Sequence, residues 1–227
     1  MCGRYVSPDD AAIEREFALT REGGHFAARY NVAPTQNAPV LRRIDGVVRL
    51  DALRFGLVPF FAHGQPGRYS TINARAESIE SSASYRGPWR RAQRCIVPAL
   101  GFYEWHLNED GSKQPYYLRV LDQSPFGFAG LWDRSVAPDG VAIESFTIIT
   151  LEANALLAEV HNVKARMPAI LARADRDAWL GASPDQARAL LRAYPAPLMS
   201  ATAVGTRVNS PRNDDPGLIE PLEPRDP

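Results

Sequence analysis

The second residue of the chain, Cys2, offers chemistry that depends on its position. A side chain this small permits removal of Met1, after which the chain would begin with an α-amine and a thiol on adjacent carbons. Such an amine is roughly a quarter unprotonated near pH ~7.4, whereas a lysine is only about a thousandth unprotonated. The amine can attack an aldehyde, and the thiol can then close a durable thiazolidine ring. Cys2 therefore predicts an aldehyde trap, provided that other residues aim and protonate it.

A first group of such residues lies in the segment STINARAE, from Ser70 to Glu77. On an extended segment, the side chains of Asn73 and Arg75 project from the same face. An amide beside a guanidinium suits the binding of a sugar-phosphate. The alternative is a polar strand face exposed to solvent.

A second group centres on Glu104, in the apolar and aromatic segment CIVPALGFYEW that begins at Cys95. Burial in such surroundings would raise the pKa of this carboxyl toward the range that is useful for proton transfer. The alternative is a glutamate at a strand end that faces water. We expect Cys95 to be a small core residue and not a nucleophile.

A third candidate is His161, in the segment VHNVKARMP, where it follows a short helical pattern and precedes a return to the core. A histidine that stands alone is more often structural than catalytic, so His161 is a candidate only in combination with the other groups. His25, His63 and His106 lie in loop-like surroundings and are not candidates.

The elements that must position these residues indicate an α+β protein. We expect a helix capped by Ser7 with Pro8 at its first position, and a later helix with a capping box of Ser183 and Gln186. The expected strands are 46–58, 94–105, 116–120, 126–132 and 145–150, and the expected later helices are 152–160 and 183–193. Pro98 should mark a bulge or a sheet edge. The acidic, proline-rich tail from Asp214 should be a loosely held extension.

Composition limits the function classes. The chain has 227 residues, a formal net charge of +0 and two cysteines, which is typical of a single globular domain in a reducing, cytoplasmic compartment. From the segment MCGRYVSPDD we expect no secretory leader, and no apolar run approaches the ~20 residues that cross a bilayer. No metal-ligand spacing is present, so we expect neither a metal nor another cofactor. Only Lys113 and Lys164 are lysines among the 26 basic residues; arginine forks suit phosphate oxygens, but a GC-rich genome would give the same bias.

The order of several short motifs supports a closer resemblance. They are MCGRY at the start, RYNVAPTQ (29–36), FGLVP (55–59), INARAE (72–77), PALGFYEW (98–105), FAGLW (128–132), TIIT (147–150) and the histidine followed by RMP (161–168). Together, from Cys2 to about Arg212, they closely resemble the SRAP family, the SOS response-associated peptidases that process abasic sites in DNA.

The resemblance implies a fold and a chemistry. The fold would be a single SRAP domain over 1–227, with a mostly antiparallel, barrel-like core of strands and peripheral helices. After loss of Met1, the N-terminal cysteine would form a thiazolidine crosslink with the opened abasic sugar in single-stranded DNA or at its junctions with duplex. The protein would be an enzyme with Schiff-base, lyase-like chemistry and a possible self-processing thiol peptidase activity. It would act as a monomer in the cytoplasm and associate with the nucleoid during DNA damage.

The same resemblance assigns site residues. Asn73 would hold the Cys2 terminus and the opened sugar, Glu104 would shuttle protons, and His161 would assist sugar ring opening. Phe61 would stack on bases, a contact that tolerates any sequence. The expected catalytic residues are Cys2, Asn73, Glu104 and His161, and the expected DNA-binding residues are Gly3, Arg4, Phe61, Arg75, Thr150 and Arg166.

The chain departs from the family pattern in two places. Phe55 stands where the family usually has a tryptophan, and four residues, Asn162 to Ala165, separate His161 from Arg166 where many members have one. His161 can still reach the site if the additional residues bulge outward.

Two other functions remain open. An N-terminal-nucleophile cysteine peptidase or amidohydrolase would use the Cys2 thiolate with His161 as its base. A noncatalytic single-strand binder would not need Cys2. Only the aldehyde trap requires the α-amine, so this group distinguishes the three hypotheses.

Overall fold

Two sheets carry the fold in the computed structural model, which describes residues 2–19, 25–67 and 70–222. The larger sheet has the order β11–β10–β4–β3–β6–β9–β12, and β9 also pairs with β10, so that five of its strands close into a ring. The ring strands are β3 (Asn37–Ile44), β4 (Val47–Phe55), β6 (Arg94–Ala99), β9 (Phe126–Val136) and β10 (Ala142–Glu152). The short strands β5 (Asn73–Arg75), β11 (Arg166–Pro168) and β12 (Ile170–Leu171) extend it. Only β4 and β5 run parallel to β10.

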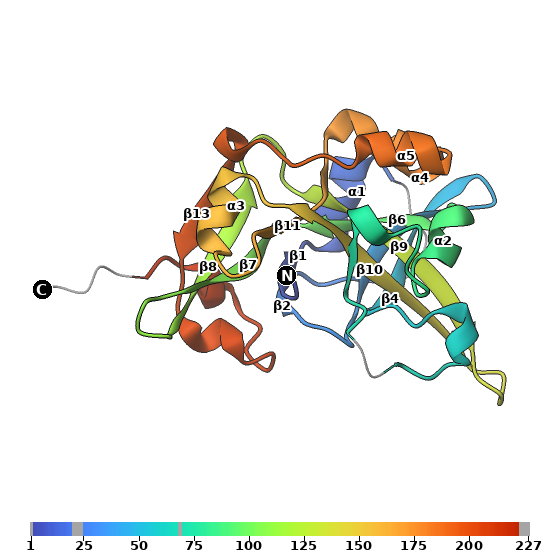
Figure 1. Cartoon of the computed structure of the whole chain (residues 1–227), viewed down its shortest axis with the longest axis horizontal. Coiled ribbons are helices and arrows are strands. Elements are labelled where there is room, and N and C mark those ends of the chain that lie inside the picture. Colours follow the sequence, from blue (N-terminus) through green and yellow to red (C-terminus); the bar gives the residue numbers. More distant parts are fainter. Residues whose placement is uncertain (1, 20–24, 68–69, 223–227) are drawn as a thin grey trace, which may run out of the picture.

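The second sheet is antiparallel and has the order β13–β8–β7–β1–β2. Its strands are β1 (Tyr5–Ser7), β2 (Arg29–Val32), β7 (Gly101–Leu107), β8 (Lys113–Val120) and β13 (Met199–Ala203). Figure 1 shows β1 and β2 in the middle of the molecule, between β7, β8 and β13 on the left and the ring on the right. The N-terminal segment therefore lies where the two sheets meet.

The helices are short and peripheral, as expected for this α+β class. They are α1 (Asp10–Phe17), α2 (Arg86–Arg90), α3 (Ala155–Val160), α4 (Arg176–Gly181) and α5 (Pro184–Leu190). Figure 1 places α1, α4 and α5 along the upper edge. Within the described ranges, no helix has the length and apolar character needed to cross a bilayer.

The capping predictions had different outcomes. The capping box of Ser183 and Gln186 is present. The first helix instead begins at Asp10, because the Asp9 side chain accepts a hydrogen bond from the backbone N–H of Ala12, while Ser7 belongs to β1. An aspartate is as good a cap as a serine, so the cap type alone did not decide the start of the helix.

The segment 94–105 is two strands and not one, because the chain passes from the ring to the second sheet at Leu100. At the start of β7, a Cβ on Gly101 would lie only 2.3 Å from the ring of Tyr117, so a glycine allows this close approach. Pro98 pairs with Gly127 of β9, whereas the pairing of β6 with β3 involves only Cys95 and Ile96. Pro98 thus lies past the contact with β3, where its missing N–H costs no bond to that strand.

Several strands, among them β1, β2, β3 and β13, were absent from the sequence-based expectation. In β3, the five residues Ala38 to Arg42 are all buried, so its sequence does not alternate between apolar and polar residues. A strand covered on both faces gives no two-residue period, and this is why the pattern missed it.

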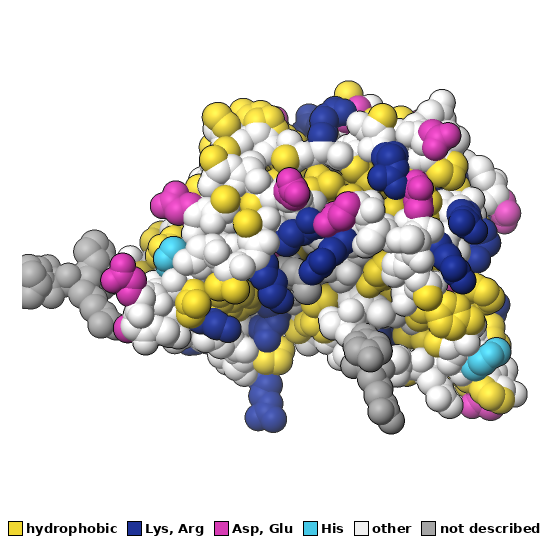
Figure 2. Space-filling view, in the orientation of Figure 1, with side chains coloured by type: hydrophobic (Ala, Val, Ile, Leu, Met, Phe, Trp, Pro, Cys, Tyr) yellow, Lys and Arg dark blue, Asp and Glu magenta, His cyan; other side chains and the backbone are white. Residues whose placement is uncertain are grey.

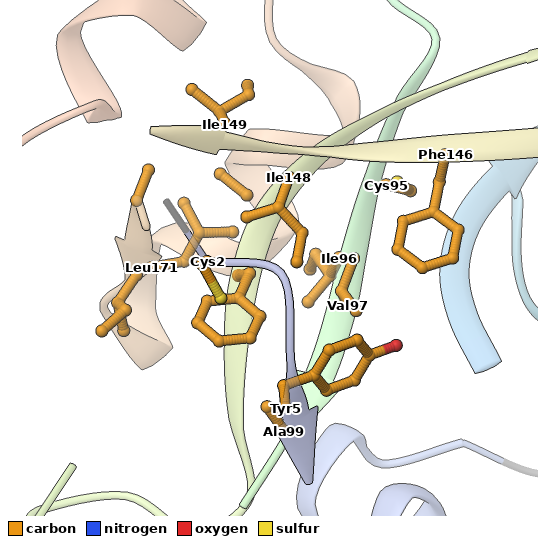
Figure 3. Close-up of a cluster of buried hydrophobic side chains, with 14 of the residues drawn as sticks. Cys2, Tyr5, Cys95, Ile96, Val97, Ala99, Phe146, Ile148, Ile149 and Leu171 are labelled. Carbon is orange, nitrogen blue, oxygen red and sulfur yellow. The ribbon is translucent and has the colours of Figure 1, made fainter. Parts of the chain in front are cut away.

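The interior of the ring is a continuous apolar cluster. Figure 3 shows Cys2 and Tyr5 among side chains from β6 and β10, including Ile96 and Ile148. Phe55 is fully buried there and stacks on Phe146, with ring centroids 5.1 Å apart. The phenylalanine at this position therefore serves packing.

The C-terminal segment 204–222 is docked, which corrects the expectation of a loose tail from Asp214. The Asp214 carboxylate accepts hydrogen bonds from the backbone N–H groups of Tyr30 and Asn31, and Leu218 is 2% exposed. Val204 forms a β-bridge with Pro221. Residues 223–227 of the predicted tail lie outside the described residues.

Candidate active site

Asn73 ties the start of the chain to the ring. It begins β5, opposite Ile148 of β10, and its Nδ2 donates to the backbone carbonyl of Cys2 at 3.1 Å. The hydroxyl of Tyr85 donates to the Asn73 carbonyl at 3.0 Å, which fixes this residue from the other side. Across the described chain, no donor reaches the buried Oδ1 of Asn73. The side chain thus offers an acceptor beside Cys2.

The Cys2 thiol is 1% exposed and belongs to the apolar cluster of Figure 3. Burial raises the pKa of this thiol well above its usual value, and the nearby Glu104 carboxylate raises it further. The thiol is therefore neutral at physiological pH. The expected loss of Met1 concerns a residue outside those that the structure describes.

Glu104 and His161 face each other at the side of this cluster. Glu104 lies on β7 and His161 follows α3, and their Oε2 and Nε2 atoms are 3.8 Å apart. Burial raises the pKa of the Glu104 carboxyl to about 7, so both protonation states are populated at neutral pH. The sequence-based expectation that Glu104 is buried and has a raised pKa is therefore confirmed, while its role in proton transfer stays a prediction.

The protonation state of His161 follows from its second nitrogen. Nδ1 lies 3.1 Å from the carbonyl oxygen of Arg166, and because a carbonyl can only accept, Nδ1 carries the proton. Burial lowers the pKa of the imidazole, which is consequently neutral near pH 7. Nε2 is then the basic nitrogen, and it is the atom that faces Glu104.

The four residues between His161 and Arg166 form an exposed turn that bulges outward and leaves His161 beside Glu104. The helix α3 is capped by Asn154, whose side chain accepts from Leu157 N, and ends at Val160. The backbone N–H of Ala165 then returns to the carbonyl of His161 at 2.9 Å. This turn leaves His161 buried, with 6% of its surface exposed.

A pocket of about 420 Å³ opens beside the Glu104–His161 pair. Its other lining residues are Trp105, Leu107, Lys113, Val163, Lys164 and Asn209. Asn209 belongs to the docked C-terminal segment and accepts a hydrogen bond from Trp105 Nε1 at 2.8 Å. Sequence reasoning did not assign these lining residues to the site; the presence of only two lysines in the whole chain was the available signal.

The expected DNA-binding arginines differ in their surroundings. Arg75 is exposed, and within the described residues its guanidinium has no hydrogen bond or ion pair. Arg4 donates to the carbonyl oxygens of Val208 and Asn209. Arg166 forms two hydrogen bonds with Glu77, at 2.6 and 3.0 Å. Of the three, Arg75 is therefore the one that is free to meet a phosphate.

The other expected DNA contacts also differ in exposure. Phe61, on the short 3-10 helix η1 (Phe60–Ala62), is 46% exposed beside Phe60, which is 53% exposed. Gly3 is half-buried. Thr150 is fully buried, and its carbonyl and hydroxyl both accept from Arg166, so the structure does not support a direct DNA contact for it. Thr150 instead holds Arg166 in place.

The described residues contain no cluster of three or more histidine, cysteine, aspartate or glutamate side chains that could hold a metal ion. The four expected catalytic residues, in contrast, meet at one place. They come from the start of the chain, β5, β7 and the turn after α3, which are separated by up to 159 residues in the sequence (161 − 2).

Comparisons with known proteins show the family to which the chain is related. The family model described as SOS response associated peptidase (SRAP) matches residues 1–211. The abasic site processing protein YoqW of Bacillus subtilis is 37% identical, over 97% of this chain and 99% of its own length. The abasic site processing protein HMCES of Gallus gallus is 32% identical, over 98% of this chain and 78% of its own length. A crystal structure of a protein from Bacteroides thetaiotaomicron is 28% identical, covers 98% of this chain and 100% of that one, and superposes with a TM-score of 0.85.

Proposed function

The chain belongs to the SOS response associated peptidase (SRAP) family, and from this premise we propose that it processes abasic sites in DNA by trapping their aldehyde on Cys2. The observation that carries the proposal is the convergence on Cys2 of Asn73 and the Glu104–His161 pair. The names of the relatives YoqW and HMCES indicate the substrate.

Opening of the sugar comes first in the proposed reaction. An abasic deoxyribose is mostly a closed hemiacetal, whose hydroxyl must lose a proton while its ring oxygen gains one. His161 is neutral and has its basic Nε2 toward Glu104, so it can take the hydroxyl proton. The protonated form of Glu104 can supply a proton to the ring oxygen, because its pKa of about 7 populates the acid at neutral pH.

Imine formation follows. After removal of Met1, the α-amine of Cys2 attacks the aldehyde carbon and gives a carbinolamine. Glu104, which regains a proton from His161 after the ring opening, donates it to the carbinolamine hydroxyl, which leaves as water. The carboxylate then takes the proton of the nitrogen, so that a neutral imine remains. The unpaired Oδ1 of Asn73 lies next to Cys2 and can accept a hydrogen bond from the attacking nitrogen, which orients its lone pair.

Ring closure completes the crosslink. The Cys2 sulfur adds to the imine carbon, its proton passes to the nitrogen, and a five-membered thiazolidine results. The whole sequence releases one water and leaves the DNA strand intact. A neutral, buried thiol suits this late step because the sulfur is protected until the imine lies beside it.

The raised pKa of the Cys2 thiol disfavours the peptidase hypothesis. A thiolate nucleophile requires a lowered pKa, which a positive neighbour or a helix N-terminus provides. Here burial and the charge of Glu104 both act in the opposite direction. Removal of Met1 remains compatible with the aldehyde trap, because this removal only has to occur before the α-amine of Cys2 reacts.

Intact-mass spectrometry after incubation with a single-stranded oligonucleotide that carries one abasic site tests the proposal. The expected product has the mass of the chain without Met1 plus that of the oligonucleotide minus one water, and peptide mapping should place the link on Cys2. An oligonucleotide with an intact base is the control. Lack of such a product, or a link to another residue, would contradict the proposal.

A further inference from the structure

Both lysines of the chain line one pocket. Lys113 and Lys164 are 51 residues apart in the sequence (164 − 113), and the other 24 of the 26 basic residues are arginines. The pocket that they share is the one that opens beside Glu104 and His161. A genome-wide preference for arginine would not select one pocket, so the position of the two lysines calls for a local explanation.

The segments that carry the two lysines both contact Leu107 at the end of β7. Lys113 begins β8, where it is paired with Leu107. Lys164 lies in the turn after α3, and this turn is fastened to the same Leu107 by Asn162. The Asn162 side chain accepts from Leu107 N and donates to Leu107 O, both at 3.0 Å. The additional residues between His161 and Arg166 thus carry Lys164 to the end of the β7–β8 hairpin.

The charge of this pocket is not balanced. Over the described residues, neither lysine forms an ion pair, and both are exposed. Among the other lining residues, only Glu104 is acidic and only His161 is titratable besides it. Burial raises the pKa of Glu104 to about 7, so this carboxyl is only partly charged at neutral pH, and burial lowers the pKa of His161, which is uncharged. The pocket therefore has an excess of positive charge that a bound anion would offset.

The neighbouring arginines are not available to bind an anion in this pocket, which leaves that role to the lysines. Arg4 is bonded to backbone carbonyls and Arg166 to Glu77, so neither guanidinium is free to neutralise an anion in this pocket. A lysine ammonium is a compact charge on a flexible stem, and it binds phosphate as a point charge. Figure 2 shows basic side chains gathered in the middle of the face on which Figure 1 places β1.

We propose that Lys113 and Lys164 form a subsite for a phosphodiester group of the DNA strand next to the abasic nucleotide. The inference rests on the proposed function, because the pocket leads to the Glu104–His161 pair where the opened sugar would react. Each nucleotide is flanked by two phosphates, and holding one of them beside Glu104 would fix the sugar relative to Cys2. The lysines are positioning residues, and the crosslink is made elsewhere.

The test compares the wild type with the K113Q/K164Q and K113R/K164R variants. The probe is a single-stranded oligonucleotide with a tetrahydrofuran abasic analogue, which has no aldehyde and reports binding alone. We expect the glutamine variant to bind about tenfold more weakly and to reduce the slope of log affinity against log salt by about 0.7 for each phosphate that it no longer neutralises. The arginine variant should retain the slope. Arg15→Gln, which removes an exposed cation on α1 outside the pocket, is the matched control.

Uncharged methylphosphonate linkages locate the phosphate. One is placed in turn at each linkage that flanks the analogue. At one of these positions it should weaken binding of the wild type and have little further effect on the glutamine variant. An unchanged affinity and slope in the glutamine variant, or an equal decrease in both proteins at every linkage, would overturn the subsite.

Two further results separate the subsite from the proposed function. A borohydride-trapped adduct between aldehyde-bearing DNA and a lysine, missing from the glutamine variant, would mean that these lysines are reacting amines and would overturn the phosphate role. Failure of Cys2 to crosslink aldehyde-bearing DNA, with the lysine effects on the analogue intact, would contradict the proposed function and leave the phosphate subsite supported.

Discussion

The two cysteines of this chain are both buried, but we expect only Cys2 to react with DNA. Cys2 is 1% exposed and Cys95 is 0% exposed, and both are free thiols. Burial raises the pKa of both thiols above the usual value. Both thiols are therefore protonated near neutral pH, and neither is activated as a thiolate nucleophile.

Their surroundings differ. Cys95 lies in the middle of the barrel on β6, where its carbonyl accepts from Trp179 Nε1 and its nitrogen belongs to a peptide bond. Cys2 is bonded to Asn73 and adjoins Glu104. In the proposed mechanism, the group that distinguishes Cys2 from Cys95 is the α-amine that loss of Met1 would expose, together with the neighbouring Glu104 and His161, which can transfer protons. The thiol would act only after the amine.

Replacement of each cysteine by alanine should give the largest difference in adduct formation between the two positions. Cys2→Ala keeps a terminal amine but cannot close a thiazolidine, so the heat-stable adduct with abasic-site DNA should disappear, while binding of the DNA remains. Cys95→Ala should form the adduct and lose about 1 kcal/mol of stability from the cavity left in the core. Intact mass and urea unfolding measure the two effects. A stable adduct in Cys2→Ala would contradict the role of the Cys2 thiol in the crosslink.

An N-terminal extension that the cell does not remove, but that an added protease can cleave off, should be nearly as damaging, because it makes Cys2 resemble Cys95. Its nitrogen becomes an amide that cannot form an imine, and the thiol alone can form only a labile hemithioacetal. We expect no stable adduct until a protease exposes Cys2. Intact mass before and after cleavage checks this. A stable adduct on the extended chain would identify a side chain as the reacting amine.

Removal of the acid should slow the reaction without abolishing it. Glu104→Gln should reduce the rate of adduct formation by about 10²-fold, the usual decrease for a general acid. In the wild type the rate should fall as the pH rises above about 7, where Glu104 loses its proton, and the glutamine variant should lack this decline. A single-turnover rate against pH, with the same decline in both proteins, would exclude Glu104 as the acid.

The Glu104 carboxyl should also make the free energy of unfolding depend on pH. Its pKa rises from 4.5 to about 7 in the folded chain, so between these values the folded state binds more protons than the unfolded state. Its contribution to stability is therefore present at low pH and decreases as the pH rises through this range. The difference in free energy of unfolding between Glu104→Gln and the wild type should grow in favour of the variant from pH 4.5 to 7. A constant difference would place the carboxyl in contact with water.

The smallest expected effect concerns the exposed arginine. Arg75→Ala should reduce the salt slope of DNA binding by about 0.7, as for one phosphate on a single strand. Arg166→Ala should instead destabilise the fold, since it leaves Glu77 without its partner and Thr150 without a buried donor. Binding titrations over a range of salt concentrations separate the two. An unchanged slope in Arg75→Ala would place Arg75 away from the DNA backbone.

Several features were predictable from the sequence because they are local. The capping box at Ser183, the strands from apolar alternation and the apolar surroundings of Glu104 depend on neighbouring residues. The uniformly buried β3 and the change of sheet at Leu100 were missed, since both depend on partners far along the chain. The docking of Asp214 onto Tyr30 and Asn31 was missed for the same reason.

What the sequence determined by itself was the chemical inventory: a cysteine behind the initiator, a glutamate in an apolar run, a histidine after a short helix and only two lysines. The tertiary structure alone decided which of these groups meet. It set the 3.8 Å between Glu104 and His161, engaged Arg4 and Arg166 in internal bonds, and brought both lysines to one pocket. The physical reason is that burial and through-space charge set a group's pKa and availability, and both depend on residues that are distant in the sequence and adjacent only in the fold.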